Sequence, residues 1–290
     1  MIHLSAFADE ISADLNEQIE VLHSENIHFI DLRGVWNINV LDLTDSQVTE
    51  IKLTLDANGI GVSAIASPIG KIPIDTPFED HLQRFRRAID LAKIFQTPYI
   101  RIFSFYPPIS EGNTNDKSRS TDPAAWRNEV LRRLRELTVL ARNANLILLH
   151  ENEKAIYGDT IARCIDLLQS INDPHFQAIF DPANFIQCEQ TPYPNAYQAL
   201  RPWLRYIHVK DALADGTVVA AGEGIARWLD TLQQLHGGGY GGFFSLEPHL
   251  ALSRQFRGFS GPELFRKASQ SFKGLLQSID WKLENSHLSS

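Results

Sequence analysis

The chain has 290 residues, of which 21% are charged and 43% are hydrophobic, and this composition is typical of a folded globular protein. Its 27 Lys and Arg residues stand against 35 Asp and Glu residues, which gives a formal net charge of −8. A nucleic-acid-binding protein normally carries a basic field, so we expect no nucleic-acid partner. No apolar stretch approaches the ~18–20 residues that a membrane-spanning helix needs, so we expect no membrane partner either.

The cysteines and the first residues of the chain indicate the compartment. Cys164 and Cys188 are too few for a disulfide framework, and they do not form a Cys-x-x-Cys pair. Residues 1–12 lack the basic segment of a signal peptide and already contain Asp9 and Glu10. We therefore expect a cytoplasmic protein with two reduced cysteines.

Short apolar or β-branched runs alternate along the chain with amphipathic stretches. The runs predict strands at residues 2–8, 27–32, 62–67, 99–105, 146–151, 178–181, 206–210 and 243–247. Between them, apolar residues at spacings of three and four predict helices, most regularly over 124–142 and similarly over 78–95 and 225–235. Strands that alternate with helices in this way predict an α/β fold, the (β/α)₈ TIM barrel, as one domain over residues 1–290.

The connecting segments differ in length according to their direction. Those from a helix to the next strand are short, whereas those from a strand to the next helix are long. Barrel enzymes build their sites from strand-to-helix loops, so the long segments favour an enzyme. The longest, residues 107–122, is either a lid or a surface excursion. The glycine cluster at 237–242 precedes the last strand and opens no helix, which favours a turn over a phosphate loop.

Four consecutive predicted strands end in a side chain that can bind a metal ion. These side chains are Glu151, Asp181, His208 and Glu247, at intervals of 30, 27 and 39 residues. Any one of them alone would more often be a helix cap, an ion-pair partner or a core histidine. Three carboxylates at one barrel mouth are costly without a cation, so the set predicts one divalent ion. An oxygen-rich set with a single histidine suits Mn²⁺, Mg²⁺ or Co²⁺, and Zn²⁺ is compatible with it.

Further polar side chains are expected at the rim of the barrel. Three of them follow a proposed ligand by two residues and so share its strand face: Glu153, Lys210 and His249. Lys210 either polarises a substrate oxygen or forms an ion pair with a rim carboxylate. Arg33, at the end of the second strand, either holds a substrate group or pairs with Asp31 or Glu151.

Three more arginines have alternative interpretations. Arg101, inside the fourth strand, is interpreted as a structural charge rather than a substrate ligand. Arg254 and Arg257 follow the eighth strand, where barrel enzymes often bind phosphate. They either hold a phosphate or carboxylate group of the substrate or lie solvated at the surface.

Five segments occur in the usual order of a known family: HENEKAIYGDT, FDPANF, RYIHVKDA, AGEGIARW and FFSLEPHL. With them, the chain resembles the xylose isomerase-like TIM barrels, also described as sugar phosphate isomerases and epimerases. The resemblance covers most of the chain, and its informative motifs lie between His150 and His249. It implies that one divalent metal ion is bound by Glu151, Asp181, His208 and Glu247. It further implies that Glu151 and Glu247 act as acid/base catalysts.

Two departures from the pattern of that family bear on function. Many relatives have a histidine where this chain has Asn184, three residues after Asp181, and we expect Asn184 to contact the substrate. The endonuclease IV branch needs additional histidines for its zinc ions, but the third and fourth strands end here in Ser67, Ser104 and Phe105. These residues argue against a nuclease and against a second tightly bound metal ion.

The residues and the resemblance together predict a metal-dependent isomerase or epimerase that acts on a small sugar, sugar phosphate or polyol. The reaction would pass through an enediolate, with Glu151 and Glu247 moving the proton and Lys210 stabilising the developing charge. The substrate contacts would be Arg33, Glu153, Asn184 and His249. The alternatives are an inosose-type dehydratase, a phosphodiesterase similar to the AP-endonucleases, and a non-catalytic sugar-binding barrel. The oligomeric state stays open, with a homo-oligomer as one outcome.

Overall fold

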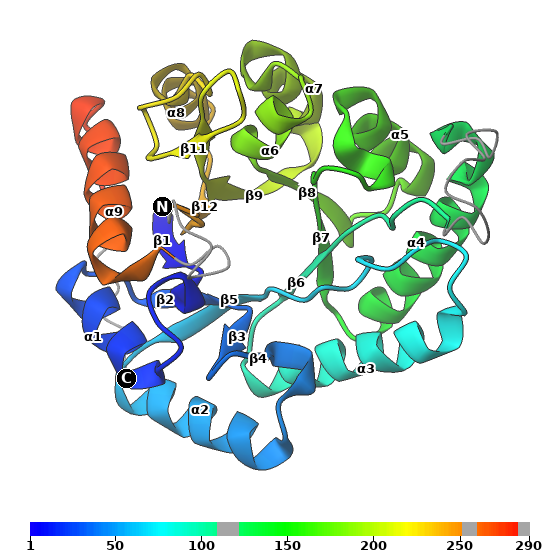
Figure 1. Ribbon diagram of the computed structural model, residues 1–290, viewed down its shortest axis with the longest axis horizontal. Coiled ribbons are helices and arrows are strands. Elements are labelled where there is room, and N and C mark those ends of the chain that lie inside the picture. Colours follow the sequence, from blue (N-terminus) through cyan, green and yellow to red (C-terminus); the bar gives the residue numbers. More distant parts are fainter. Residues whose placement is uncertain (109–121, 251–259, 284–290) are drawn as a thin grey trace.

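The computed structural model of the protein describes residues 1–108, 122–250 and 260–283. Its main sheet consists of β1 (Ile2–Ala6), β2 (Phe29–Leu32), β5 (Gly61–Ile65), β6 (Tyr99–Ile102), β7 (Ile147–Glu151), β8 (Phe176–Phe180), β9 (Leu204–Val209) and β12 (Gly242–Leu246). The strands are parallel, in the order β1, β12, β9, β8, β7, β6, β5, β2. The two ends of this order, β1 and β2, pack against each other, so the sheet is a nearly closed barrel (Figure 1). The predicted TIM barrel is confirmed.

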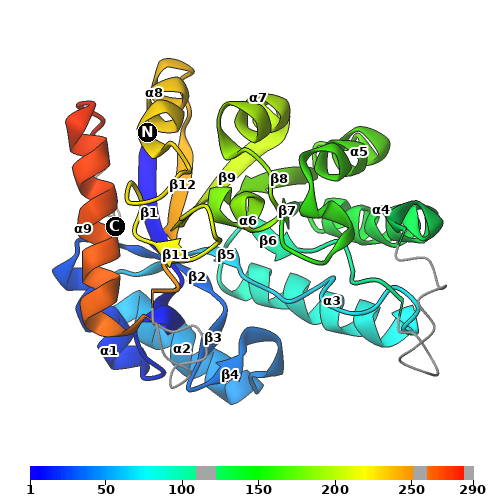
Figure 2. The same cartoon turned by 45° about the horizontal axis from the view of Figure 1, so that its top comes forward.

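The helices surround this barrel (Figures 1 and 2). They are α1 (Leu15–Ser24), α2 (Asp45–Ala57), α3 (Phe78–Ile94), α4 (Arg127–Asn143), α5 (Ile161–Ile171), α6 (Pro182–Gln187), α7 (Tyr197–Leu200), α8 (Trp228–Gly237) and α9 (Gly261–Ser278). Their apolar faces turn inward, as in α3, where Leu82, Phe85, Ala88, Ile89 and Ala92 are buried at helical spacing. In the described part of the chain, no helix combines the length and apolarity needed to cross a membrane.

Two helices begin later than their sequence patterns predict. The pattern over 124–142 is divided between a 3₁₀ turn at Pro123–Ala125 and α4. The pattern over 225–235 becomes helical only at Trp228. The reason is that the Ile225 N–H donates to the Ala212 carbonyl at 2.9 Å, and the Ala226 N–H donates to Asp211 Oδ1 at 3.0 Å. These two amides are therefore fixed outside the helix.

The strand-to-helix segments contain two small antiparallel ribbons. They are formed by β3 (Gly34–Val35) with β4 (Ile38–Asn39), and by β10 (Asp211–Ala212) with β11 (Val218–Val219). The glycine cluster at 237–242 joins α8 to β12, as the sequence predicts for a turn. Most of the predicted long loop, residues 109–121, and both Arg254 and Arg257 lie outside the described residues.

A polar cluster lies inside the barrel, where an all-apolar core would be expected. The Tyr206 hydroxyl lies 2.9 Å from Asp31 Oδ2 and 2.9 Å from Ser63 Oγ, and Ser63 Oγ lies 2.5 Å from Ser5 Oγ. All four side chains are buried, and their hydrogen bonds offset the cost of that burial. Asp31 is thus engaged inside the barrel and is not a partner of Arg33.

Asp211 organises the segment between β9 and α8. Its Oδ1 accepts hydrogen bonds from the N–H groups of Ala212 and Ala226, and its Oδ2 accepts from those of Gly222 and Gly224. The indole of Trp228 donates to the Lys210 carbonyl at 3.2 Å. The backbone around Lys210 is therefore held on both sides.

Gly224→Ala is expected to destabilise the fold by roughly 1–3 kcal/mol, the usual cost of overpacking. An added Cβ would lie 2.3 Å from both the Ala212 carbonyl oxygen and Asp211 Oδ1. Urea denaturation measures the change in the free energy of unfolding. The control is Gly274→Ala in α9, where an added Cβ meets nothing within 4 Å and helix propensity predicts a gain of roughly 0.5–1 kcal/mol. Equal effects of the two substitutions would contradict this account of Asp211.

Candidate metal centre

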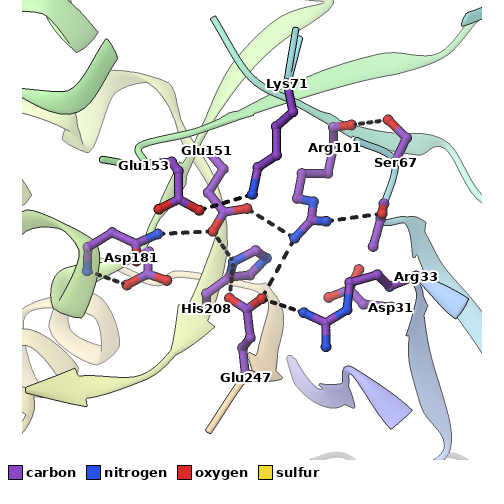
Figure 3. Close-up of polar contacts among 12 residues, drawn as sticks. Asp31, Arg33, Ser67, Lys71, Arg101, Glu151, Glu153, Asp181, His208 and Glu247 are labelled. Carbon is purple, nitrogen blue, oxygen red and sulfur yellow. Dashed lines mark hydrogen bonds and ion pairs between the residues drawn. The ribbon is translucent and has the colours of Figure 1, made fainter. Parts of the chain in front are cut away.

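Four side chains converge at the carboxyl ends of neighbouring strands (Figure 3). Glu151 is the last residue of β7, Asp181 directly follows β8, His208 lies in β9, and Glu247 directly follows β12. Each side chain offers one ligand atom, and these four atoms all lie within 4.8 Å of one another. His208 Nδ1, for example, is 3.2 Å from Glu151 Oε1 and 3.5 Å from Glu247 Oε2. The predicted quartet is therefore brought together in one cluster.

Burial makes the charges of this cluster strongly dependent on one another. It raises the pKa of Asp181, as do the neighbouring glutamates, and this pKa is about 6. Burial also opposes ionisation of Glu151, but His208 and Arg101 outweigh it and lower the pKa of Glu151 to about 2. Burial alone would lower the pKa of His208, but Glu151 and Glu247 raise it to about 10. Without a metal ion, His208 is thus a cation at neutral pH.

Three further cations contact the carboxylates of the cluster. Lys210 Nζ lies 2.8 Å from Asp181 Oδ2 and 3.1 Å from Glu247 Oε2. Arg101 Nη1 lies 3.1 Å from Glu151 Oε2, and Arg33 Nη1 lies 2.9 Å from Glu247 Oε1. Lys210 therefore forms the ion pairs with rim carboxylates that the sequence left as one alternative. Arg101, interpreted from the sequence as a structural charge, contacts the proposed ligands directly.

The donor set fits a divalent metal ion. Three carboxylates and one imidazole are the ligands that divalent ions from Mg²⁺ to Zn²⁺ use in proteins. Asp181 is held in place because its Oδ1 accepts the Asn184 N–H at 2.9 Å, so its Oδ2 is left to face the cluster. Glu151 is held by the Asn184 amide, whose Nδ2 lies 3.2 Å from Glu151 Oε1. The residues present therefore fit a divalent metal ion.

Arg33 has other partners than the sequence predicts. It contacts Asp9 at 2.7 Å, Glu10 at 2.9 Å and Glu247 at 2.9 Å, and not Asp31 or Glu151. Asp9 and Glu10 lie in the 3₁₀ turn Ala8–Glu10 that comes shortly after β1. Because β1 packs against β2 in the nearly closed barrel, these two side chains meet Arg33 across that seam. Arg33 does form ion pairs, but the predicted pairing with Asp31 or Glu151 is wrong.

The other predicted substrate contacts also line the mouth. Arg33, Glu153, Asn184, Lys210 and His249 all border a cavity of about 380 Å³ together with Arg101 and Lys71. Glu153 Oε2 lies 3.1 Å from Lys71 Nζ. His249 Nδ1 lies 2.9 Å from Glu10 Oε1, and its Nε2 lies 3.3 Å from Glu247 Oε1. Each predicted side chain thus reaches the cavity while it contacts a protein partner.

Sequence reasoning assigned no role in the site to Lys71 or Phe103, and it undervalued Arg101. A signal for Arg101 was present, because a charged residue inside the apolar run Tyr99–Ile102 must have a buried partner. Lys71 lies in an irregular segment after β5, and no spacing rule places its side chain.

The chain is similar to known proteins in both sequence and fold. A family model described as xylose isomerase-like TIM barrel matches residues 19–275. A curated 3-dehydroshikimate dehydratase from Bacillus anthracis is 24% identical over 194 residues, which are 67% of this chain. The match covers 65% of that protein's length.

Several solved structures share the fold. A probable 3-DHS dehydratase from Bacillus anthracis has a TM-score of 0.69 at 17% identity, over 94% of this chain and 99% of its own. A D-tagatose 3-epimerase-like protein has a TM-score of 0.73 at 15% identity, and the match covers 96% of this chain and 98% of that protein. A protein from Mycobacterium smegmatis, solved in complex with magnesium, has a TM-score of 0.68 at 17% identity. The match covers 95% of this chain and 97% of that protein. Because the family model spans most of the sequence, the chain belongs to the xylose isomerase-like TIM barrel family.

Proposed function

We propose that one divalent metal ion is bound by Glu151, Asp181, His208 and Glu247, with Mn²⁺, Mg²⁺, Co²⁺ and Zn²⁺ as the candidates. The convergence of four buried donors at one barrel mouth is the observation that carries this proposal. The magnesium complex of a barrel of the same fold supports it. When bound, the ion would supply a Lewis acid for a carbonyl or hydroxyl oxygen of the substrate.

The proposed reaction is the isomerisation or epimerisation of a small sugar or polyol, begun by removal of a proton next to a carbonyl. Glu151 and Glu247 reach the mouth from β7 and β12, which are separated in the sheet by β8 and β9. One glutamate would take the proton and the other would return it. The cations around them lower the pKa of both, so each is an ionised carboxylate at neutral pH and can accept a proton.

The remaining side chains would bind and orient the substrate. Lys210 Nζ lies between Asp181 and Glu247 at the cavity, where its charge would stabilise negative charge on a substrate oxygen. Asn184 would keep Glu151 in position through its amide. Arg33, Glu153 and His249 would contact substrate hydroxyl groups from the rim.

A dehydratase is the second candidate, and the 3-dehydroshikimate dehydratase relative favours it. The first step would be the same removal of a proton by a glutamate. The C–O bond of a hydroxyl on the next carbon would then break, with the glutamate that took the proton passing it to the leaving oxygen so that water departs. The products would be a carbon–carbon double bond and one water molecule.

The first prediction concerns metal content. The purified protein should bind about one divalent ion per chain, because one set of four ligands is present among the described residues. Asp181→Asn and His208→Ala should each lose the ion in elemental analysis. Glu153→Gln, which removes a carboxylate of the same cavity outside the ligand set, should retain it. A wild-type protein that takes up no Mn²⁺, Co²⁺ or Zn²⁺ would refute the proposed site.

The second prediction concerns protons. The pKa of His208 is raised from 6.5 to about 10, so His208 must lose a proton before its nitrogen can bind a metal ion. Metal binding between about pH 7 and 9 should therefore release about one proton, and the metal affinity should rise with pH. Calorimetry in buffers of different ionisation enthalpy measures the number released. Binding without proton release would contradict the expectation that His208 is a cation before the ion binds.

The third prediction concerns the reaction. In D₂O, an epimerised or isomerised ketose should carry deuterium at the reprotonated carbon, because a protonated glutamate exchanges with solvent. Mass spectrometry and NMR measure this label. Glu151→Gln and Glu247→Gln should each lower turnover by at least ~10² at saturating Mn²⁺, with metal occupancy measured in each variant.

The outcomes of this experiment separate the candidates. A product without deuterium would indicate a hydride shift and remove the glutamates from the acid/base role. A product from 3-dehydroshikimate that is lighter by one water would favour the dehydratase. Binding of a polyol without turnover of any ketose would favour the non-catalytic barrel.

A further inference from the structure

Along one side of the cavity, three cations that line it lie against two aromatic rings buried behind them. Arg33 Cζ lies 4.7 Å from the centre of the Phe7 ring, and Arg101 Cζ lies 5.1 Å from the same centre. Arg101 Cζ also lies 5.0 Å from the centre of the Phe103 ring, and Lys71 Nζ lies 4.2 Å from that centre. Both rings are fully buried, so they support the cations rigidly. We name this series, Arg33, Phe7, Arg101, Phe103 and Lys71, the cation wall (Figure 3 shows its three cations).

The two ends of the cation wall differ in how deeply the ion pairs of their cations are buried. Arg33 and Arg101 are paired with the buried glutamates of the metal centre. Lys71, at the outer end, is paired with Glu153 in a contact that solvent reaches, since the side chains are 32% and 19% exposed. Ion pairs that water can reach contribute less than fully buried ones, so a ligand can replace one partner at low cost.

Lys154 adds a second cation at the outer end. It is exposed and borders the same cavity. Within residues 1–108, 122–250 and 260–283, no ion pair of Lys154 is found. The outer rim thus places two lysines against one carboxylate, Glu153, in a chain whose formal net charge is −8. This local excess of positive charge would attract an anion into the cavity.

We propose that the substrate carries an anionic group, a carboxylate or a phosphate, and that Lys71 and Lys154 bind it at the outer end of the cation wall. This inference rests on the proposed function and assigns its substrate class. The reacting carbons would then lie between Glu151 and Glu247, and a cavity of about 380 Å³ admits a molecule of that size. Glu153 would pair with Lys71 in the absence of substrate. When substrate binds, its anionic group would replace Glu153 as the partner of Lys71.

The test compares three six-carbon polyols that differ in one group: D-glucitol, D-gluconate and D-glucitol 6-phosphate. Calorimetry with the Mn²⁺-loaded protein at constant ionic strength measures each dissociation constant. We expect at least one of the two acids to bind about tenfold more tightly than D-glucitol. The carboxylate and phosphate ligands distinguish the two sources of negative charge.

Substitutions at the rim should change this preference in opposite directions. Lys71→Met and Lys154→Met should each reduce it, whereas Glu153→Gln should increase it because Lys71 is then released. Lys52→Met is the control, since Lys52 pairs with Asp56 on α2 and lies outside this cavity. The control should leave all three dissociation constants unchanged.

Three results would overturn the proposal. They are equal affinities for the three polyols, no binding of any of them, and a preference for acids that the combined Lys71→Met and Lys154→Met variant retains. The last result would mean that the acid group binds elsewhere, at the metal ion or at another cation of the cavity. Any of these results together with deuterium incorporation into a neutral ketose would leave the proposed function intact. Acid binding that depends on Lys71, without turnover of any substrate, would instead contradict the proposed function alone.

Discussion

Three carboxylates are buried within 4.8 Å of one another at the mouth of the barrel, and their mutual repulsion organises the surrounding structure. Glu151, Asp181 and Glu247 are each at most 3% exposed, so water screens their charges poorly. Positive charge must therefore be supplied by the protein or by a bound ion. In the protein alone, it comes from the neighbouring imidazole, ammonium and guanidinium groups. The pKa of each cluster member is set by this balance more than by its own chemistry.

Outward from the cluster, positively and negatively charged side chains alternate. Arg33 contacts Glu247 on its inner side and the carboxylates of Asp9 and Glu10 on its outer side. His249 bridges Glu10 and Glu247 in the same way. Because each charge has neighbours of the opposite sign, the polar groups are fixed before any substrate arrives. Such preorganisation is what an enzyme site needs in order to stabilise charge without further rearrangement.

Much of this arrangement could be predicted from the sequence. Parallel strands end at one edge of a barrel, so four strand-end ligands at regular intervals had to meet there, and the structure places them together. What could not be predicted depends on contacts between distant loops. The partners of Arg33 lie after β1, and closure of the barrel brings them within reach. The late start of α8 follows from hydrogen bonds to Asp211 and Ala212. The spacing of apolar residues in the sequence cannot predict such bonds. The metal ligation and the roles of the rim side chains remain predictions.

The ion pairs of Arg33 also have a consequence for how this barrel can diversify. The hydrogen-bonded strand order begins at β1 and ends at β2, and Arg33 spans that seam at the mouth by contacting Asp9 and Glu10. A mutation of Arg33 that adapted the cavity to a different substrate would also loosen the closure of the barrel. Lys71 and Lys154 line the cavity but do not also link β1 to β2, because neither pairs across the seam. In a lineage of these barrels, new specificity would therefore arise more readily at the outer rim, while the inner arginine would be retained by selection for folding.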